Sequence, residues 1–318
     1  MSPAKTAALA GAVLLVTLLS VLSGPRFINP LDIRPQDWHI LVALRLPRAF
    51  VAFLMGAALG ASGAILQGVF RNPLADPYVL GISSGAALAA AFGLMTATSL
   101  PLPVPILAFG GALLTCVAVA ALGRSPQGLR PDRLLLGGIG IGFFFSALLL
   151  LVMTVSSNDG LKRAILWMSG DLSMADWRLV PAGAVLIAAG LTLALIRAKG
   201  LNALTLGDEI AHGLGFSPGR ERLLLFIAAS LMTAAAISLG GTVGFIGLLV
   251  PHAVRHWVGS DARISVPAAA LVGGALLCLA DGAGRTLAAP LEIPAGVIAA
   301  LIGAPCFLII LRKKGYGL

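Results

Sequence analysis

Long apolar segments alternate with short polar segments along the whole chain. A bilayer core is crossed by about 20 apolar residues in helical conformation. The segments that lack Asp, Glu, Lys and Arg are long enough for this, and they run over 6–25, 49–70, 77–123, 134–158, 179–196, 223–254, 264–280 and 293–311. The pattern therefore predicts membrane-spanning helices joined by short loops.

Two of these segments divide. The segment 77–123 is long enough for two helices, and prolines interrupt it within 101–105. Gly240 and Gly241 split 223–254, and the short glycine-rich piece that follows predicts an interrupted or half-buried helix. The sum is about ten spans of roughly 20 residues each.

The polar segments between the spans are too short to form a core of their own. We therefore predict an all-α polytopic membrane protein with a single transmembrane domain over 1–318. An even number of spans puts both termini on one side. Lys and Arg are more frequent in the segments on that side, which predicts N-in and C-in orientation. The first apolar segment is longer than a signal-peptide core, so we expect an uncleaved helix.

Composition agrees with this interpretation. Hydrophobic residues make up 58% of the chain and charged residues 11%, whereas soluble domains are about 25% charged. This excludes an ordinary soluble enzyme, a disordered chain and a disulfide scaffold. A net charge of +9 can indicate nucleic-acid binding. Here the basic residues are spread between apolar segments, so we attribute them to membrane topology and expect no nucleic-acid partner.

The sequence lacks the motifs that would power transport or catalysis within this chain. The dipeptide Gly-Lys is absent, so there is no nucleotide-binding P-loop. The apolar segments carry no Asp, Glu, Lys or Arg, whereas ion-coupled transporters place ionisable residues near mid-span. An ion-coupled secondary transporter and a membrane enzyme are therefore the weaker alternatives, and the energy for uphill transport would come from a partner.

The polar segment 197–222 contains a short amphipathic stretch. Asp208 and Glu209 lie where a helix would begin, and a helix N-terminus favours acidic side chains. Gly213 and Gly215 are placed to end that helix. The stretch suits docking into another protein and equally suits a helix that lies on the membrane surface.

Other polar residues have two interpretations each. His252 and His256 have the spacing of metal ligands on one helix face, yet no nearby carboxylate or cysteine completes a site. Arg45 and Arg48 flank Pro47 at an expected helix start, where positive charge is unfavourable. An acidic partner outside the membrane or lipid headgroups would account for them.

Several longer strings together resemble the membrane subunit of type II ABC importers, the FecCD-type permease family, which includes the cobalamin importer permease. The resemblance covers nearly the whole chain in order. It is carried by RLPR (45–48), GAALGASGAILQGVFRNPLADPYVLGISSGA (56–86), LWMSGDLSMADW (166–177), LGDEIAHGLG (206–215), GGTVGFIGLLVPHAVR (240–255) and EIPAGVIAALIGAPCFLIIL (292–311).

The resemblance implies a ten-helix permease that forms a homodimer around a central pathway in the bacterial cytoplasmic (inner) membrane. It also implies two cytoplasmic ATPase subunits, which hold ATP and magnesium, and an extracytoplasmic substrate-binding protein. No cofactor and no metal are expected on this chain. The family transports iron–siderophore complexes, haem or cobalamin, and these motifs do not distinguish the substrates. A free-metal ABC permease is a nearer alternative. It would be expected to use His and carboxylates in its spans, whereas the four histidines lie outside the spans or at their ends.

Residue roles follow from the resemblance where the motifs match. The ATPase-coupling helix would comprise Leu206, Gly207, Asp208, Glu209, Ile210, Ala211, His212, Gly213, Leu214 and Gly215. The arginines presented to acidic residues of the binding protein would be Arg45, Arg48 and Arg285. The pathway and gate would include Ser83, Ser84, Gly85, Gly138 and Ser146.

Overall fold

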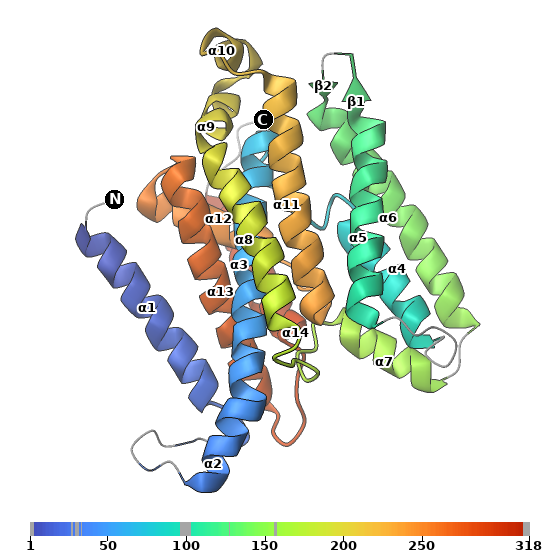
Figure 1. Ribbon diagram of the computed structural model, residues 1–318, viewed down its shortest axis with the longest axis vertical. Coiled ribbons are helices and arrows are strands. Elements are labelled where there is room, and N and C mark those ends of the chain that lie inside the picture. The colour runs from blue at the N-terminus through green and yellow to red at the C-terminus, as the bar shows by residue number, and fades with distance from the viewer. Residues whose placement is uncertain are drawn as a thin grey trace.

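The computed structural model describes residues 3–26, 28, 32, 34–95, 103–126, 128–155 and 158–313, and these ranges are mainly helical (Figure 1). A short antiparallel pair, β1 (Arg124–Ser125) and β2 (Gly128–Leu129), lies between α5 and α6. The helices are α1 (Pro3–Leu22), α2 (Pro35–Ile40), the π-helical η1 (Leu41–Arg45), α3 (Leu46–Val69), α4 (Ile82–Met95), α5 (Val104–Gly123), α6 (Pro131–Thr154), α7 (Asn158–Met168), α8 (Val180–Ile196), α9 (Ala198–Leu206), α10 (Asp208–Gly213), α11 (Pro218–Gly240), α12 (Ile246–Val258), α13 (Ala262–Leu287) and α14 (Ala295–Lys313).

The all-α membrane prediction is confirmed, and the count of about ten spans is confirmed as an approximation. Five helical segments are long and apolar enough to cross a bilayer: Pro35–Val69, Val104–Gly123, Pro131–Thr154, Pro218–Gly240 and Ala262–Leu287. A sixth is the pair α8 and α9, which bends by 57°. The remaining predicted segments form the shorter helices α1, α4, α12 and α14.

The central helix begins earlier than the hydrophobic pattern indicated. α2, η1 and α3 run as one helical segment from Pro35 to Val69, whereas the charge-free segment starts at 49. The π-helical turn lies directly before Pro47, whose missing N–H disturbs the regular hydrogen-bond ladder. Arg45 and Arg48 therefore lie inside a helix, and the expectation that they stand at a helix start is wrong.

Glycines let α3 pack closely against two neighbours. A Cβ added to Gly56 or Gly60 would overlap backbone atoms of α13, next to Gly273. A Cβ on Gly63 would overlap the carbonyl of Gly247 in α12. Small residues at these positions therefore allow close helix crossing.

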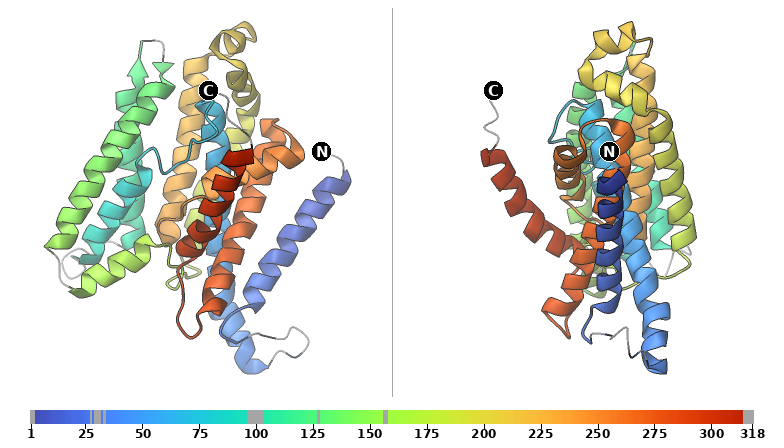
Figure 2. Two further views of the ribbon diagram at one scale, coloured as in Figure 1. Left: turned by 180° about the vertical axis from the view of Figure 1, so that it is seen from behind. Right: turned by 90° about the vertical axis from the view of Figure 1, so that its left-hand side faces the viewer.

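The helices form two groups that meet along α11 (Figure 1). One group contains α4, α5, α6 and α7, and α11 packs along α5 at its edge. The other surrounds α3 with α1, α8, α12 and α13. The start of α1 and the end of α14 point toward the end of the molecule that carries α10, as expected for an even number of spans (Figure 2). α14 leans away from the body in the same figure.

The predicted interruption after α11 is confirmed. α11 ends at Gly240, and Gly241 has a φ of 82°, which favours glycine. An irregular segment follows, in which Phe245 also has a positive φ of 68°. α12 is then a helix of only 13 residues.

Candidate functional site

The segment expected to contact an ATPase forms a short helix at one tip of the molecule (Figure 1). α9 ends at Leu206, and Gly207 adopts a φ of 123° that a side chain would strain. α10 begins directly at Asp208 and ends at Gly213, and Gly215 has a φ of 84°. The predicted start and end of this helix are confirmed.

This tip carries exposed apolar side chains. Leu206 at the end of α9 is 61% exposed, and Ile210 and Leu214, which are four residues apart on one side of α10, are 50% and 59% exposed. Ala211 is buried and holds α10 against the body. Exposed apolar side chains at the polar end of a membrane protein are typical of a protein contact surface.

Asp208 connects this tip to three other segments. Its carboxylate accepts a hydrogen bond from Arg222 of α11, and the Arg71 guanidinium beyond the end of α3 lies 3.6 Å away. Arg222 also donates from Nη1 to the carbonyl of Leu129 in β2, over 3.5 Å. A cavity of about 610 Å³ opens beside these residues, and His212 and Arg130 contribute to its lining. A displacement of α10 would therefore act on α3, α11 and the β1–β2 pair.

The residues expected along the pathway do not share one environment. A Cβ on Gly85 would overlap the Thr115 hydroxyl, and a Cβ on Gly138 would lie 2.7 Å from the Cα of Leu80. Both glycines thus allow close approaches between segments of this chain. Ser84 donates to the carbonyl of Gly81 over 2.8 Å.

Ser83 and Ser84 are half-buried on α4, and Ser146 is exposed on α6. α6 lies at the periphery of the chain, because only 11% of an 18-residue apolar stretch of this helix is buried. A pathway role for the three serines stays a prediction.

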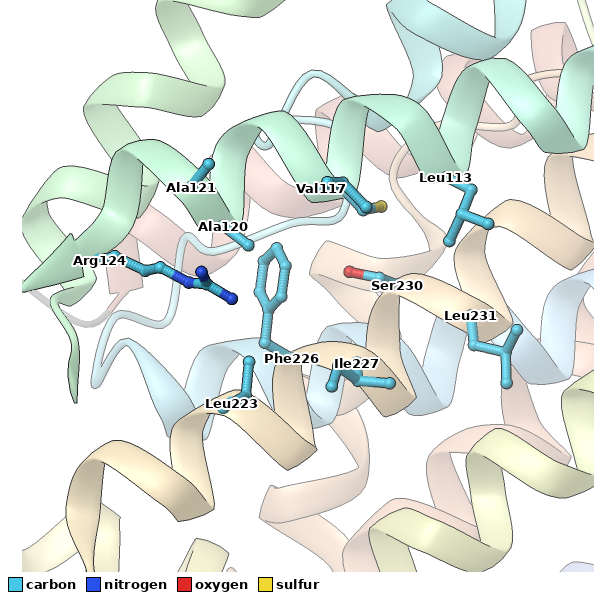
Figure 3. A pocket seen from close by; sticks show the side chains of 11 residues that line it. Leu113, Val117, Ala120, Ala121, Arg124, Leu223, Phe226, Ile227, Ser230 and Leu231 are labelled. Carbon is cyan, nitrogen blue, oxygen red and sulfur yellow. The ribbon is translucent and has the colours of Figure 1, made fainter.

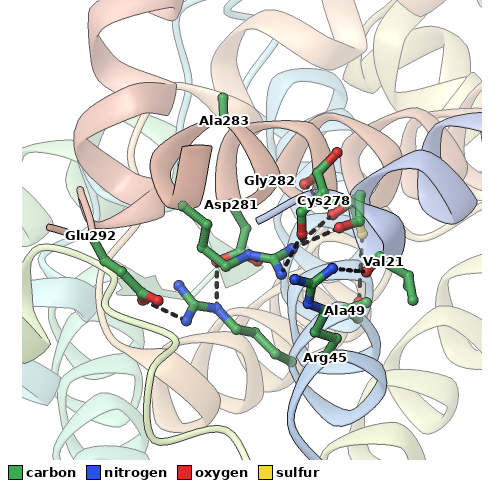
Figure 4. A network of polar contacts seen from close by, with 12 residues as sticks. Val21, Arg45, Ala49, Cys278, Asp281, Gly282, Ala283 and Glu292 are labelled. Atoms are coloured by element: carbon green, nitrogen blue, oxygen red, sulfur yellow. Dashed lines mark hydrogen bonds and ion pairs between the residues drawn. The ribbon is translucent and has the colours of Figure 1, made fainter. Parts of the chain in front are cut away.

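The three arginines expected to dock a binding protein are buried. Figure 4 shows Arg45 in a network of polar contacts with Asp281 and Glu292 nearby, and Figure 1 shows that α2, directly before this region, lies at the end of the molecule opposite α10. Arg48 donates from Nε to Asp281 over 2.8 Å and from Nη1 to Glu292 over 2.7 Å. Arg285, four residues after Asp281 in α13, lies 3.0 Å from its second oxygen.

Arg45 and Arg285 also hold the end of α1. Arg45 donates to the carbonyls of Leu22 and Arg26 over 2.7 and 2.6 Å, and Arg285 donates to the carbonyl of Ser20 over 2.8 Å. Carbonyls at a helix C-terminus lack partners within the helix and favour positive charge.

These contacts revise the premise of the docking prediction. It assumed exposed positive charge, whereas Arg45, Arg48 and Arg285 are 7%, 9% and 3% exposed and are paired inside the chain. The structure gives them the role of joining α1, α3, α13 and the start of α14. Binding of an external protein at these residues stays a prediction without an exposed cation to support it.

Gln67 is a buried polar residue that the sequence analysis missed. Pro251 has no N–H, so the carbonyl of Gly247, one helical turn earlier, loses its usual donor. Gln67 Nε2 donates to that carbonyl over 3.2 Å, and Arg255 donates to the Gln67 side-chain oxygen. A proline inside an apolar helix was the available signal, since it demands a donor from elsewhere.

The histidines of α12 do not gather with other ligands. His256 is exposed and His252 half-buried. Within the ranges that the structure describes, no three His, Cys, Asp or Glu side chains are placed to hold a metal ion.

Comparison with known proteins gives one family. The FecCD transport family matches residues 12–313. The hemin transport system permease protein HmuU of Yersinia pestis is 42% identical over 286 residues, which cover 87% of this chain and 84% of that protein. The cobalamin import system permease protein BtuC of Halobacterium salinarum is 40% identical over 281 residues, covering 88% of this chain and 75% of that protein.

A solved structure agrees over the full length. It is the inward-facing conformation of a transporter assigned to the metal-chelate type of ABC transporters. The TM-score is 0.89 and the sequence identity 28%, and the match covers 98% of this chain and 99% of that chain. The match over residues 12–313, the named relatives and the likeness to the solved structure lead to one conclusion. This multi-pass membrane chain belongs to the FecCD transport family and is a permease subunit of an ABC importer.

Proposed function

We propose that this chain forms the translocation pathway of an importer for a bulky metal chelate or corrinoid, driven by a separate ATPase. The observation that carries the proposal is the α9–α10 tip. It presents the exposed apolar side chains of Leu206, Ile210 and Leu214. It is also tied through Asp208 to α3 and α11, so force applied there reaches helices that cross the membrane.

The proposed function also includes partners. Two copies would enclose the pathway, and α6 and α14, which expose apolar side chains such as Phe143 and Leu301, would offer surfaces for contact between them. Each copy would bind one cytoplasmic ATPase through α10, and an extracytoplasmic binding protein would deliver the substrate to the opposite end. The chain itself would have no catalytic role and would lie in a bacterial inner membrane.

The substrate class rests on the relatives and on the chemistry of the helices. Related permeases are named for hemin, cobalamin and Fe(3+) dicitrate transport. The apolar spans offer few charged groups outside the buried networks at the two ends. Such a conduit binds its cargo weakly, which favours release of a large chelate.

Reconstitution with the partner ATPase and binding protein in proteoliposomes tests the proposal. Hemin and cobalamin serve as probes, and ATP hydrolysis is measured together with uptake. Ile210→Asp should abolish substrate-stimulated hydrolysis and uptake, whereas the matched control Ile210→Val should retain both. Glu209→Gln tests the polar side of the same helix and should weaken coupling. Uptake by the permease without ATPase, or full coupling in Ile210→Asp, would refute the proposal.

A further inference from the structure

A narrow apolar groove runs between α5 and α11 on the outer surface of the helix bundle (Figure 3). Its volume is about 310 Å³. The walls include Val117 and Ile227, which are 63% and 44% exposed, and the floor includes Phe226, which is buried. Both helices are long enough to cross the membrane, so the groove opens toward lipid.

The groove is about as long as one leaflet is thick. It extends along α5 from Arg124 to Leu113. At 1.5 Å per helical residue this is about 16 Å. The hydrocarbon core is about 30 Å thick, so one leaflet contributes about 15 Å. The groove therefore starts at one membrane surface and ends near the bilayer centre, which is the reach of a single acyl chain.

A cation stands at the surface end of the groove. Arg124 directly follows α5, its side chain is exposed, and Figure 3 shows its guanidinium directed along the groove on the side of Phe226. None of the ion pairs found among residues 3–26, 28, 32, 34–95, 103–126, 128–155 and 158–313 involves Arg124. This end of the molecule also carries α10, and the proposed function makes it the cytoplasmic end.

We propose that this groove binds one anionic phospholipid of the cytoplasmic leaflet. One acyl chain lies between Val117 and Ile227, and the phosphate is held by Arg124. Anionic lipids give the cytoplasmic leaflet its negative surface potential, to which basic side chains near the membrane are attracted. The positive charge of Arg124 at the surface end of the groove favours an anionic headgroup, and the length of the groove matches one acyl chain.

A second helix is a poorer occupant. A transmembrane helix is about 10–12 Å wide with its side chains and needs about 30 Å to cross the core. A groove of about 310 Å³ that ends near mid-membrane does not accommodate one. A single acyl chain is narrow enough for the groove and reaches only to the middle of the membrane.

Native mass spectrometry of the full chain tests the proposal. The purified permease is equilibrated with dioleoylphosphatidylglycerol or dioleoylphosphatidylethanolamine, and lipid retained per chain is counted. Arg124→Ala should lower retention of the anionic lipid about fivefold, the effect of one basic residue near an anionic surface. Arg124→Lys keeps the charge and should retain it. Arg220→Ala is the matched control, an exposed cation at the same end that does not line the groove.

A second variant separates the groove from the charge. Ala120→Phe adds a ring to the groove wall and should lower retention of both lipids, while size-exclusion chromatography confirms that it folds. Equal loss in Arg124→Ala and Arg220→Ala would overturn the proposal, since the attraction would then be nonspecific. A change of oligomeric state in Ala120→Phe with unchanged lipid retention would also overturn it in favour of a protein contact. Neither readout uses ATP or cargo, so failure here leaves the proposed transport function untouched.

Discussion

Removal of the Asp281 carboxylate should be the most damaging single change at the end opposite α10. Asp281 lies between two arginines, with Arg48 Nε at 2.8 Å and Arg285 Nε at 3.0 Å. Its own side chain is 0% exposed, and those arginine side chains are 11% and 4% exposed. Asp281→Ala therefore leaves two buried guanidinium groups without their shared counterion.

The magnitude follows from burial. Removing one partner of a buried ion pair costs about 3–5 kcal/mol, because the remaining charge is uncompensated. Glu292 offers a matched comparison, since it pairs with the same Arg48 but its side chain is 39% exposed. Exposed pairs contribute about 0–1 kcal/mol. Glu292→Ala should thus cost under about 1 kcal/mol, and Arg48 keeps Asp281 as its partner.

Reversible unfolding in mixed micelles, with helicity followed against denaturing detergent, measures the difference. Asp281→Ala should lower the free energy of unfolding by roughly 3 kcal/mol more than Glu292→Ala does. Asp132→Ala removes a carboxylate from the exposed pair with Arg130 and should leave the unfolding curve unchanged. Equal destabilisation by Asp281→Ala and Glu292→Ala would refute the reasoning, because burial would then not determine the cost.

Three further predictions concern packing, a buried amide and a helix cap. Gly63→Ala should prevent recovery of a monodisperse protein because its Cβ would overlap the carbonyl of Gly247, whereas Gly244→Ala, with no atom within 4 Å, should purify normally. Gln67→Leu leaves the Gly247 carbonyl without a donor and should lower the unfolding free energy by about 1–3 kcal/mol in the same assay; no loss would contradict the proline argument. Asp261 caps α13, and hydrogen bonds from the Asn202 side chain and the Arg263 amide lower its pKa. A carboxylate whose pKa is lowered by folding stabilises the folded state above its unfolded pKa of about 3.9, and this stabilisation is lost as the pH falls through the folded pKa. Thermal melts of wild type and Asp261→Ala should therefore differ at pH 7 and converge below about pH 4.

The sequence by itself determined the broad architecture. Charge-free segments predict helices that lie in lipid, because an unpaired charge there is costly and an uninterrupted helix satisfies its own backbone. The Gly240-Gly241 break and the start of α10 at Asp208 were also predictable, since glycine conformation and the helix dipole act over a few residues. The family strings added the order of the helices and the role expected of α10.

Only the tertiary structure decided which polar residues face inward. Arg48 and Asp281 are 233 positions apart, and Gln67 meets Gly247 across 180 positions. A hydrophobic pattern records the average polarity around each residue, and it carries no information about a distant partner that neutralises a charge or supplies a donor. For that reason Arg45, Arg48 and Arg285 resembled exposed cations in the sequence, whereas in the folded chain they are buried and hold α1, α3 and α13 together.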